Sequence, residues 1–286
     1  MRDPAPMPAD WTLVITGCGT SHGNPPFGQS ELWSSDPRDR RRRSGAQLHG
    51  PEGQVILIDT GPDLLDQLRD PFADWDRVQY PARCVTRCDA VLMTHVHADH
   101  SHGLNDLRHI NRLMRQAGRR APIQVHGQAG HLAELRAMFP YCFGDGGEFY
   151  TLSAPTLGTT PLSDDVATTI AGLTVTAFAM SHGPAGRTTG YRLGDCAYLT
   201  DLKELPASAD LLLAGLDLLV LDMLRAEIHE THLCWAEAEA IIQRLKPQRT
   251  VLTHMGHEVQ WAAWQHRLPA NVAMAVDGWS TGFRPC

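Results

Sequence analysis

The chain has 286 residues, 43% hydrophobic and 20% charged, which suits a sizeable folded core and excludes a disordered chain or a coiled coil. No apolar run approaches the roughly 20 residues that span a bilayer, and the polar N-terminus lacks the apolar stretch of a signal peptide, so we expect a cytoplasmic protein without membrane contact. The net charge of −7 argues against broad nucleic-acid binding, and seven scattered cysteines argue against a disulfide framework.

Short apolar runs alternate with helical patterns, which predicts a single α/β domain over residues 1–286, with residues 1–10 as a flexible N-terminal tail. Apolar, β-rich runs predict strands at 11–16, 54–58, 89–94, 123–126, 173–180, 191–193, 197–200, 218–221 and 250–253. Apolar residues at three- and four-residue steps predict helices at 62–69, 104–114, 131–138 and 235–245. The segment 145–170, rich in Gly, Thr, Ser and Asp, is predicted to be a surface excursion.

Side chains of metal-binding type come just after several predicted strands: His95, His182, Asp201 and His254. In α/β sheets, ligand sites gather beyond the strand ends, where loops on a rigid scaffold meet. We therefore expect these four side chains to converge on one site.

The strongest motif is His95-Val96-His97-Ala98-Asp99-His100. Imidazole and carboxylate groups are good ligands for Zn²⁺, Mn²⁺ and Fe²⁺. Two histidines two residues apart in extended backbone point to the same side, so His95 and His97 can share one ion while Asp99 and His100 face a neighbouring one. Paired hydrolytic metal ions lie roughly 3.5–4 Å apart, and Asp201 can bridge them. A solvated His-rich turn or a single structural zinc site is the alternative.

On these motifs the chain resembles the metallo-β-lactamase-fold hydrolases, which have a four-layer αββα sandwich and a two-metal site. It is most similar to their phosphodiesterase branch, close to the cyclic phosphodiesterases of phosphonate utilisation and more distantly to the tRNA 3′-processing nucleases. The resemblance extends from about residue 12 to 278 and rests on these segments: 17–21, 57–60, 94–100, His182, 200–201, His232 and 253–254.

The resemblance implies a ligand set for two divalent ions, zinc or manganese, with iron also allowed. One ion is held by His95, His97 and His182, the other by Asp99, His100 and His254, with Asp201 bridging them. It also implies that Asp59 supports the histidine loop from behind, although ordinary turn chemistry at the end of a strand is the alternative.

A water shared by two divalent ions is partly deprotonated and becomes a hydroxide nucleophile, which suits phosphodiesters, β-lactams, lactones and thioesters alike. His232 is the residue that separates these classes, because expulsion of an alkoxide from a phosphodiester needs a proton donor and imidazole supplies one. Phosphodiesterases of this fold carry such a histidine; a surface or capping histidine at a helix entrance is the alternative. His232 and Asp99 are therefore the candidate catalytic residues, and His229 is a weaker candidate for the role of His232.

Phosphate contacts are expected from the basic run 38–43, in which Arg43 precedes Ser44, and from His22 and His229 in the pocket. The alternative for the arginines is a solvated loop with Asp36 and Asp39 as partners. Residues 21–44 hold no cysteine, so we expect the accessory zinc site of the phosphonate-pathway relatives to be missing. Between Asp201 and His254 we expect only a strand and a helix, without the arm that grips tRNA, which argues against a structured nucleic acid as partner.

These features predict a two-metal phosphodiesterase that acts on small phosphate diesters, cyclic ones included, by attack of a metal-bridging hydroxide. A carboxylic-ester, lactone or thioester hydrolase on the same metal scaffold is the alternative. A binding or sensing protein that keeps the metals without catalysis is a third. Because relatives are often dimers, a homodimer is compatible with this prediction.

Overall fold

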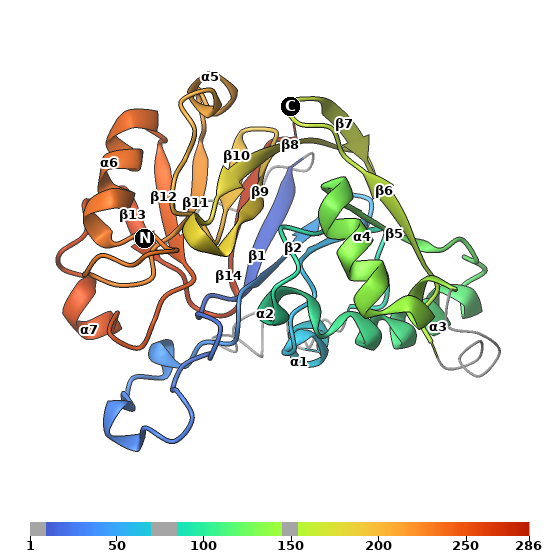
Figure 1. Cartoon of the computed structure of the whole chain (residues 1–286), viewed down its shortest axis with the longest axis horizontal. Helices are drawn as coiled ribbons and strands as arrows, with labels where there is room; N and C mark the ends of the chain where they lie inside the picture. Colours follow the sequence, from blue (N-terminus) through green and yellow to red (C-terminus); the bar gives the residue numbers. More distant parts are fainter. Residues whose placement is uncertain (1–9, 70–84, 145–153, 286) are drawn as a thin grey trace.

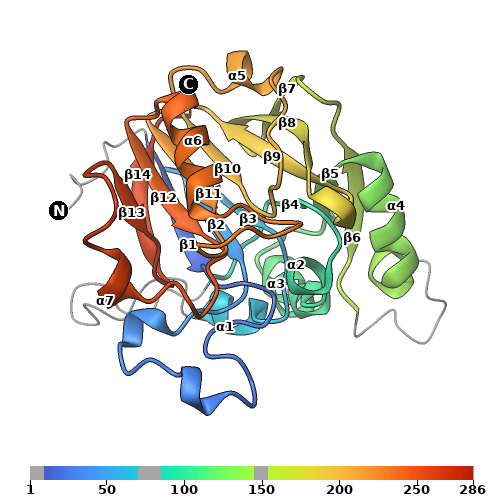
Figure 2. The same ribbon diagram turned by 60° about the vertical axis from the view of Figure 1, so that its left-hand side comes forward.

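The computed structural model of the chain describes residues 10–69, 85–144 and 154–285. The predicted N-terminal tail, residues 1–10, therefore lies outside the described residues except for residue 10. Two seven-stranded sheets face each other (Figures 1 and 2). The first sheet has the order β14 (Trp279–Phe283), β1 (Trp11–Gly17), β2 (Gly45–His49), β3 (Val55–Ile58), β4 (Ala90–Leu92), β5 (Ile123–Gly127) and β6 (Leu157–Pro161). The second has the order β13 (Val272–Met274), β12 (Arg249–Thr253), β11 (Leu218–Asp222), β10 (Cys196–Leu199), β9 (Arg187–Leu193), β8 (Leu173–Ser181) and β7 (Ala167–Ile170).

Helices cover the outer faces of both sheets (Figure 1). Along the chain they are α1 (Leu64–Arg69), α2 (Ala98–Ser101), α3 (Leu107–Gln116), α4 (Ala129–Met138), α5 (Ala209–Leu212), α6 (Trp235–Leu245) and α7 (Trp261–Trp264). Apolar residues of α1, α3 and α4 share one core with the first sheet, and those of α6 share the other core with the second sheet. The predicted four-layer αββα architecture is thus confirmed. None of the described helices is both long and apolar enough to cross a membrane.

The alternation of side chains along β3 shows how one strand serves both cores. Ile56 and Ile58 point into the core between the sheets, whereas Val55 and Leu57 join the core beneath the helices. A strand that is buried on both faces has a continuous apolar run, and this is why the sequence identified it.

The prediction of a surface excursion over 145–170 is wrong for residues 154–170, which are the part of this segment that the structure describes. Residues 157–161 form β6, which pairs with β5, and residues 167–170 form β7, which pairs with β8. Both segments contain threonine, which favours strands. Both strands also lie at the edge of a sheet, where a neighbouring strand packs on one side only, so they form without a continuous apolar run. A further difference is α5, because it adds a short helix to the strand and helix expected between Asp201 and His254.

The parallel strands determine where the site forms. β3 runs parallel to β4, and β10, β11 and β12 run parallel to one another. β8 is antiparallel to β9, which is antiparallel to β10, so β8 has the same direction as β10. The carboxyl ends of these strands therefore meet at common edges of the two sheets, and the loops that follow them face one another across the sandwich.

The guanidinium of Arg41 ties the N-terminal loop to the segment after β12. Arg41 is buried and donates to the carbonyl oxygens of Gly256 at 3.0 Å and Val259 at 2.5 Å, and to Asp39 at 2.9 Å. The same Asp39 oxygen accepts from the backbone NH of Trp261 at 2.8 Å. These bonds hold together two segments that are more than two hundred residues apart in the chain.

We predict that Arg41→Met lowers the free energy of unfolding by about 3–5 kcal/mol, because it leaves the Asp39 carboxylate buried without its cation. Urea denaturation measures this change. Arg38→Met is the matched control in the same arginine run, since the ion pair of Arg38 with Asp36 is partly exposed, and it should leave the midpoint almost unchanged. Equal shifts for the two variants would contradict the structural role of Arg41.

Candidate metal centre

The histidine loop between β4 and α2 is held by the carboxylate of Asp59, which directly follows β3. Asp59 is buried and accepts hydrogen bonds from the backbone NH and the hydroxyl of Thr94, both at 2.8 Å. Its Oδ2 also lies 2.6 Å from Nδ1 of His100. Because a carboxylate accepts, Nδ1 carries the proton, and Nε2 of His100 is turned toward Asp201, whose Oδ2 is 3.0 Å away. Asp59 therefore supports the loop from behind, as expected.

Two further histidines are oriented in the same way. Nδ1 of His182 lies 2.7 Å from the carbonyl oxygen of Thr231, so it donates and leaves Nε2 free. Nδ1 of His95 lies 3.0 Å from the Thr94 hydroxyl, whose own proton goes to Asp59. A hydrogen bond that fixes the tautomer of the imidazole is typical of histidines that bind metals.

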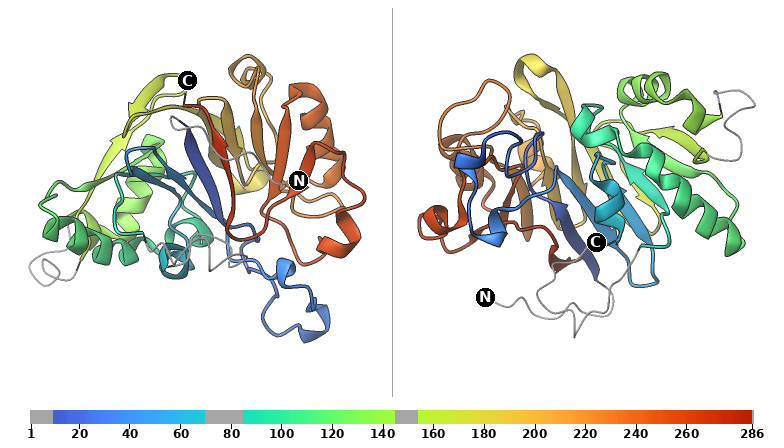
Figure 3. Two further views of the ribbon diagram at one scale, coloured as in Figure 1. Left: turned by 180° about the vertical axis from the view of Figure 1, so that it is seen from behind. Right: turned by 90° about the horizontal axis from the view of Figure 1, so that it is seen from below.

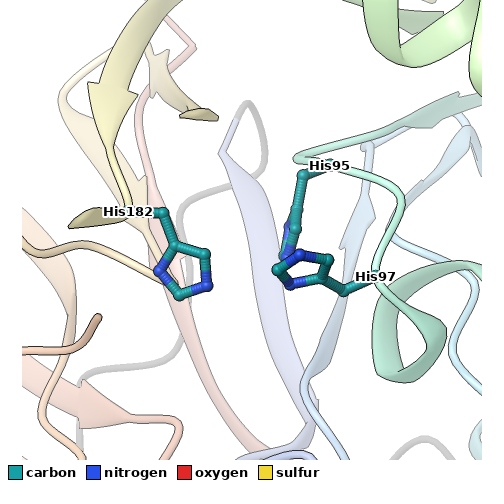
Figure 4. A group of neighbouring side chains, drawn as sticks. All are labelled: His95, His97 and His182. Carbon is teal, nitrogen blue, oxygen red and sulfur yellow. The ribbon is translucent and has the colours of Figure 1, made fainter. Parts of the chain in front are cut away.

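His95, His97 and His182 form the first group of candidate ligands. One ligand nitrogen from each lies within 4.8 Å of the others. Their ring centroids are 4.4 Å apart for His95 and His97, 5.3 Å for His97 and His182, and 5.6 Å for His95 and His182. Figure 4 shows the three rings turned toward one another from loops that belong to different sheets. His97 is exposed, so this group is open to solvent on its side.

Asp99, His100, Asp201 and His254 form the second group, and all four are buried. Nε2 of His254 lies 3.4 Å from Oδ1 of Asp201 and 3.6 Å from Oδ2 of Asp99. The Asp201 carboxylate also approaches the first group, with Oδ1 at 3.9 Å from Nε2 of His95 and 3.7 Å from Nε2 of His182. The structure thus brings all seven predicted ligands together, with Asp201 between the two groups.

Three site residues have a left-handed backbone. Asp59, Asp201 and His254 have φ values of 63°, 53° and 58°, and each comes one or two residues after a strand. This conformation is uncommon for residues other than glycine and costs of order 1–3 kcal/mol each when it is imposed. It ends the extended backbone at these positions, where Asp201 and His254 join the cluster and Asp59 bonds to the histidine loop.

Burial and neighbouring charges set the protonation of the cluster. Burial, reinforced by His100, holds the pKa of His95 well below its ordinary value, and burial also lowers the pKa of His182. Burial alone would raise the pKa values of Asp99 and Asp201, but attraction to His100 outweighs it and lowers both. Neutral imidazoles and ionised carboxylates are the forms that bind divalent cations.

Several buried nitrogens in the cluster have no hydrogen-bond partner, namely Nε2 of His95, His100 and His254. Buried polar atoms are normally paired, so such atoms point to a ligand that completes them. His254 also shows the pull of the carboxylates: burial would lower its pKa, yet Asp201 and Asp99 raise it to about 9. The cluster therefore fits divalent cations, and the assignment of each residue to an ion remains a prediction.

His232 lies beside this cluster and is oriented by Asp222, which the sequence analysis did not select. Nε2 of His232 is 3.9 Å from Oδ1 of Asp201, and its Nδ1 is 3.1 Å from Oδ2 of Asp222. Asp222 is buried and also accepts from the backbone NH of Leu202. Asp222 ends β11, directly after the apolar run 218–221, so the strand-end rule that identified the other ligands would have found it.

The residues that were predicted to contact phosphate differ in their partners and in their exposure. Arg43 binds Asp63 through Nε at 2.9 Å and Nη2 at 2.6 Å. Arg38 pairs with Asp36 in a partly exposed ion pair, as the alternative expected. Arg41 pairs with Asp39 but is buried, so the expected solvated loop is wrong for Arg41. His22 is exposed beside Ser21, and the ring of His229 lies 5.4 Å from that of His232. Substrate contact by Arg43, His22 and His229 remains a prediction.

Residues 54–255 match the family described as a beta-lactamase superfamily domain. This segment contains the histidine loop, Asp201, Asp222, His232 and His254. The chain therefore belongs to the beta-lactamase superfamily, and its paired sheets with outer helices have the metallo-β-lactamase fold.

Solved structures of known proteins have the same architecture. A diphosphatase described as new and from the PhnP family is 30% identical, with a TM-score of 0.80 over 97% of this chain and 98% of that chain. Zn²⁺-bound PqqB from Methylobacterium extorquens shares the fold, with a TM-score of 0.68 and 20% sequence identity. The match covers 94% of this chain and 99% of the PqqB chain.

Curated relatives give a mixed picture of activity. A ribonuclease Z from Mycobacterium sp. strain KMS is 27% identical over 252 residues, which are 79% of this chain and 84% of that protein. An octanoyltransferase from Porphyromonas gingivalis is 30% identical over 270 residues, which are 93% of this chain. This chain spans only 50% of the octanoyltransferase.

We predict that Asp59→Asn lowers zinc affinity by about 10–100-fold, the usual effect of losing a group that orients a metal-binding histidine. Asparagine keeps the size of the side chain and tolerates the left-handed backbone, so the loss reports on the bonds to Thr94 and His100. Competition with a chromogenic chelator measures the affinity. Asp63→Asn, which breaks only the pair with Arg43, is the control. Unchanged affinity in Asp59→Asn would contradict the supporting role.

We predict that Gly61→Ala disturbs the same loop through sterics alone. A Cβ at Gly61 would collide with the carbonyl oxygen of Asp99, so the loop must move and zinc affinity should fall by about tenfold or more. Gly130→Ala in α4, where a Cβ meets nothing within 4 Å, is the matched control and should bind zinc normally. Chelator competition measures the zinc affinity of both variants, and equal affinities would refute the prediction.

Proposed function

We propose that the protein is a two-metal phosphodiesterase that acts on small phosphate diesters, cyclic ones included. The observation that carries this proposal is the position of His232, next to the bridging candidate Asp201 and hydrogen-bonded from behind by Asp222. The printed activities of two relatives, a diphosphatase and a ribonuclease Z, support phosphate-ester chemistry.

The two groups of side chains would hold one cation each, with Asp201 shared between them. When bound, such cations lower the pKa of water and neutralise the charge that builds up on phosphoryl oxygens. The orientation of the ligands comes from the protein's own residues. Buried Asp59, Thr94 and the carbonyl group of Thr231 keep the imidazoles in the tautomer that presents Nε2 to the site.

His232 has the geometry of a proton donor to the leaving group. Its Nδ1–H is donated to Asp222, which fixes the ring and directs Nε2 toward the cluster. The partner carboxylate also stabilises a positive charge on the ring, as in acid–base pairs that hold an imidazole by a buried aspartate. An alkoxide that leaves phosphorus would take the proton of Nε2, and a carboxylic ester or lactone has less need of this donor.

We predict that His232→Ala reduces kcat by about 10²–10⁴-fold on a 2′,3′-cyclic nucleotide. The loss should be much smaller on bis(p-nitrophenyl) phosphate, because p-nitrophenolate leaves without a proton. Asp222→Asn should show the same dependence on the leaving group with a smaller loss.

Metal content per chain, measured by plasma mass spectrometry, is the control and should be unchanged in both variants. An equal loss on the two diesters would overturn the role of His232 as a donor. Faster turnover of lactones or thioesters than of diesters by the wild-type protein would overturn the substrate class.

A further inference from the structure

The exposed face of α3 carries a row of arginines. Arg108, Arg112 and Arg115 follow one another at steps of four and three residues, which places them on one face of the helix. The opposite face, with Leu107, Ile110 and Met114, is buried in the core beneath the first sheet. Figure 3 shows α3 on the outer side of that sheet. The row therefore faces away from the molecule.

This row is not neutralised by the part of the chain that the structure describes. α3 contains no acidic residue. Within residues 10–69, 85–144 and 154–285, no ion pair is found for Arg108 or Arg112, and Arg115 donates to the hydroxyl of Thr156. Like charges four residues apart on a helix destabilise it by about 0.2–0.5 kcal/mol per pair. The protein keeps this repulsion although its overall net charge is −7.

The row lines a groove of about 560 Å³. Besides the three arginines, the described residues that line the groove are His109, Asn111, Gln116 and Ala154, and none of these is acidic or a Phe, Tyr or Trp. The described lining thus offers positive charge and hydrogen-bond donors without a large apolar side chain.

We propose that the arginine row of α3 is a docking face for the phosphate backbone of single-stranded nucleic acid. The guanidinium group binds phosphate oxygens bidentately, and the helical rise spaces the three groups by about 6 and 4.5 Å along the axis. Contact is made with the phosphates, because the described lining of the groove has no Phe, Tyr or Trp ring on which a base can stack. Binding is therefore independent of base sequence.

An acidic protein segment fits the groove less well. Protein partners gain most of their affinity from a few buried aromatic or apolar anchors, and the described residues that line this groove provide no pocket of that kind. The local row also explains how an acidic chain can bind a polyanion: salt screens interactions beyond about 8–10 Å, so nearby arginines outweigh the distant net charge.

The test is fluorescence anisotropy of a fluorescein-labelled twelve-residue oligothymidylate with the whole protein at 50 mM salt. The double variant Arg108→Gln, Arg112→Gln should weaken binding at least about tenfold. It should also make the slope of log K against log salt shallower by about 1.4, since each phosphate contact on a single strand contributes about 0.7. The control variant Arg69→Gln, Arg267→Gln removes two exposed arginines elsewhere and should bind like the wild type.

The proposal is overturned if the oligothymidylate fails to bind, if the α3 variant and the control bind equally well, or if an oligoglutamate of the same length binds as tightly as the oligothymidylate. Turnover of bis(p-nitrophenyl) phosphate by the α3 variant should remain at the wild-type level. Loss of docking with intact turnover separates this surface from the metal centre, so either proposal can fail without the other.

Discussion

The burial of two carboxylates, Asp99 and Asp201, is the constraint on which the rest of this structure depends. An isolated buried carboxylate is costly unless a positive charge or several hydrogen bonds compensate it. The imidazoles of His100 and His254 compensate the carboxylates only when they are protonated, and the carboxylates raise the pKa values of both. Burial holds His95 and His182 in the neutral form. Divalent cations would supply the positive charge without these protons and would also complete the unpaired ring nitrogens. A metal centre therefore accounts for the cluster better than a network of ion pairs.

The surrounding architecture prepares these side chains for that charge. Parallel strands end at the same edge, and the chain has a left-handed backbone at Asp59, Asp201 and His254, which follow β3, β10 and β12. Behind the site, Asp59 and Asp222 each accept a hydrogen bond from an imidazole Nδ1–H, so Nε2 is the atom that faces the cluster. The site is thus organised before any ligand arrives, and this lowers the cost of binding one.

Local patterns predicted many of the elements and the side chains that converge on the cluster, while contacts between distant parts of the chain could not be predicted. The apolar period over 235–245 coincides with α6, and the strand-end rule found His95, His182, Asp201 and His254. The same rule covers Asp222, which directly follows the predicted strand 218–221, although the sequence analysis did not select it. The arginine run showed the opposite problem: whether Arg41 faces solvent or a buried carbonyl depends on Gly256, 215 residues away, and no local pattern contains that contact. Edge strands such as β6 escaped detection because they lack a continuous apolar run.

The central claim is that two cations occupy the cluster and share Asp201. Anomalous diffraction from crystals grown with zinc or manganese tests it directly. Two peaks roughly 3.5–4 Å apart are expected, one bordered by His95, His97 and His182 and the other by Asp99, His100 and His254, with the Asp201 carboxylate between them. A single peak, or peaks away from these side chains, would contradict the account.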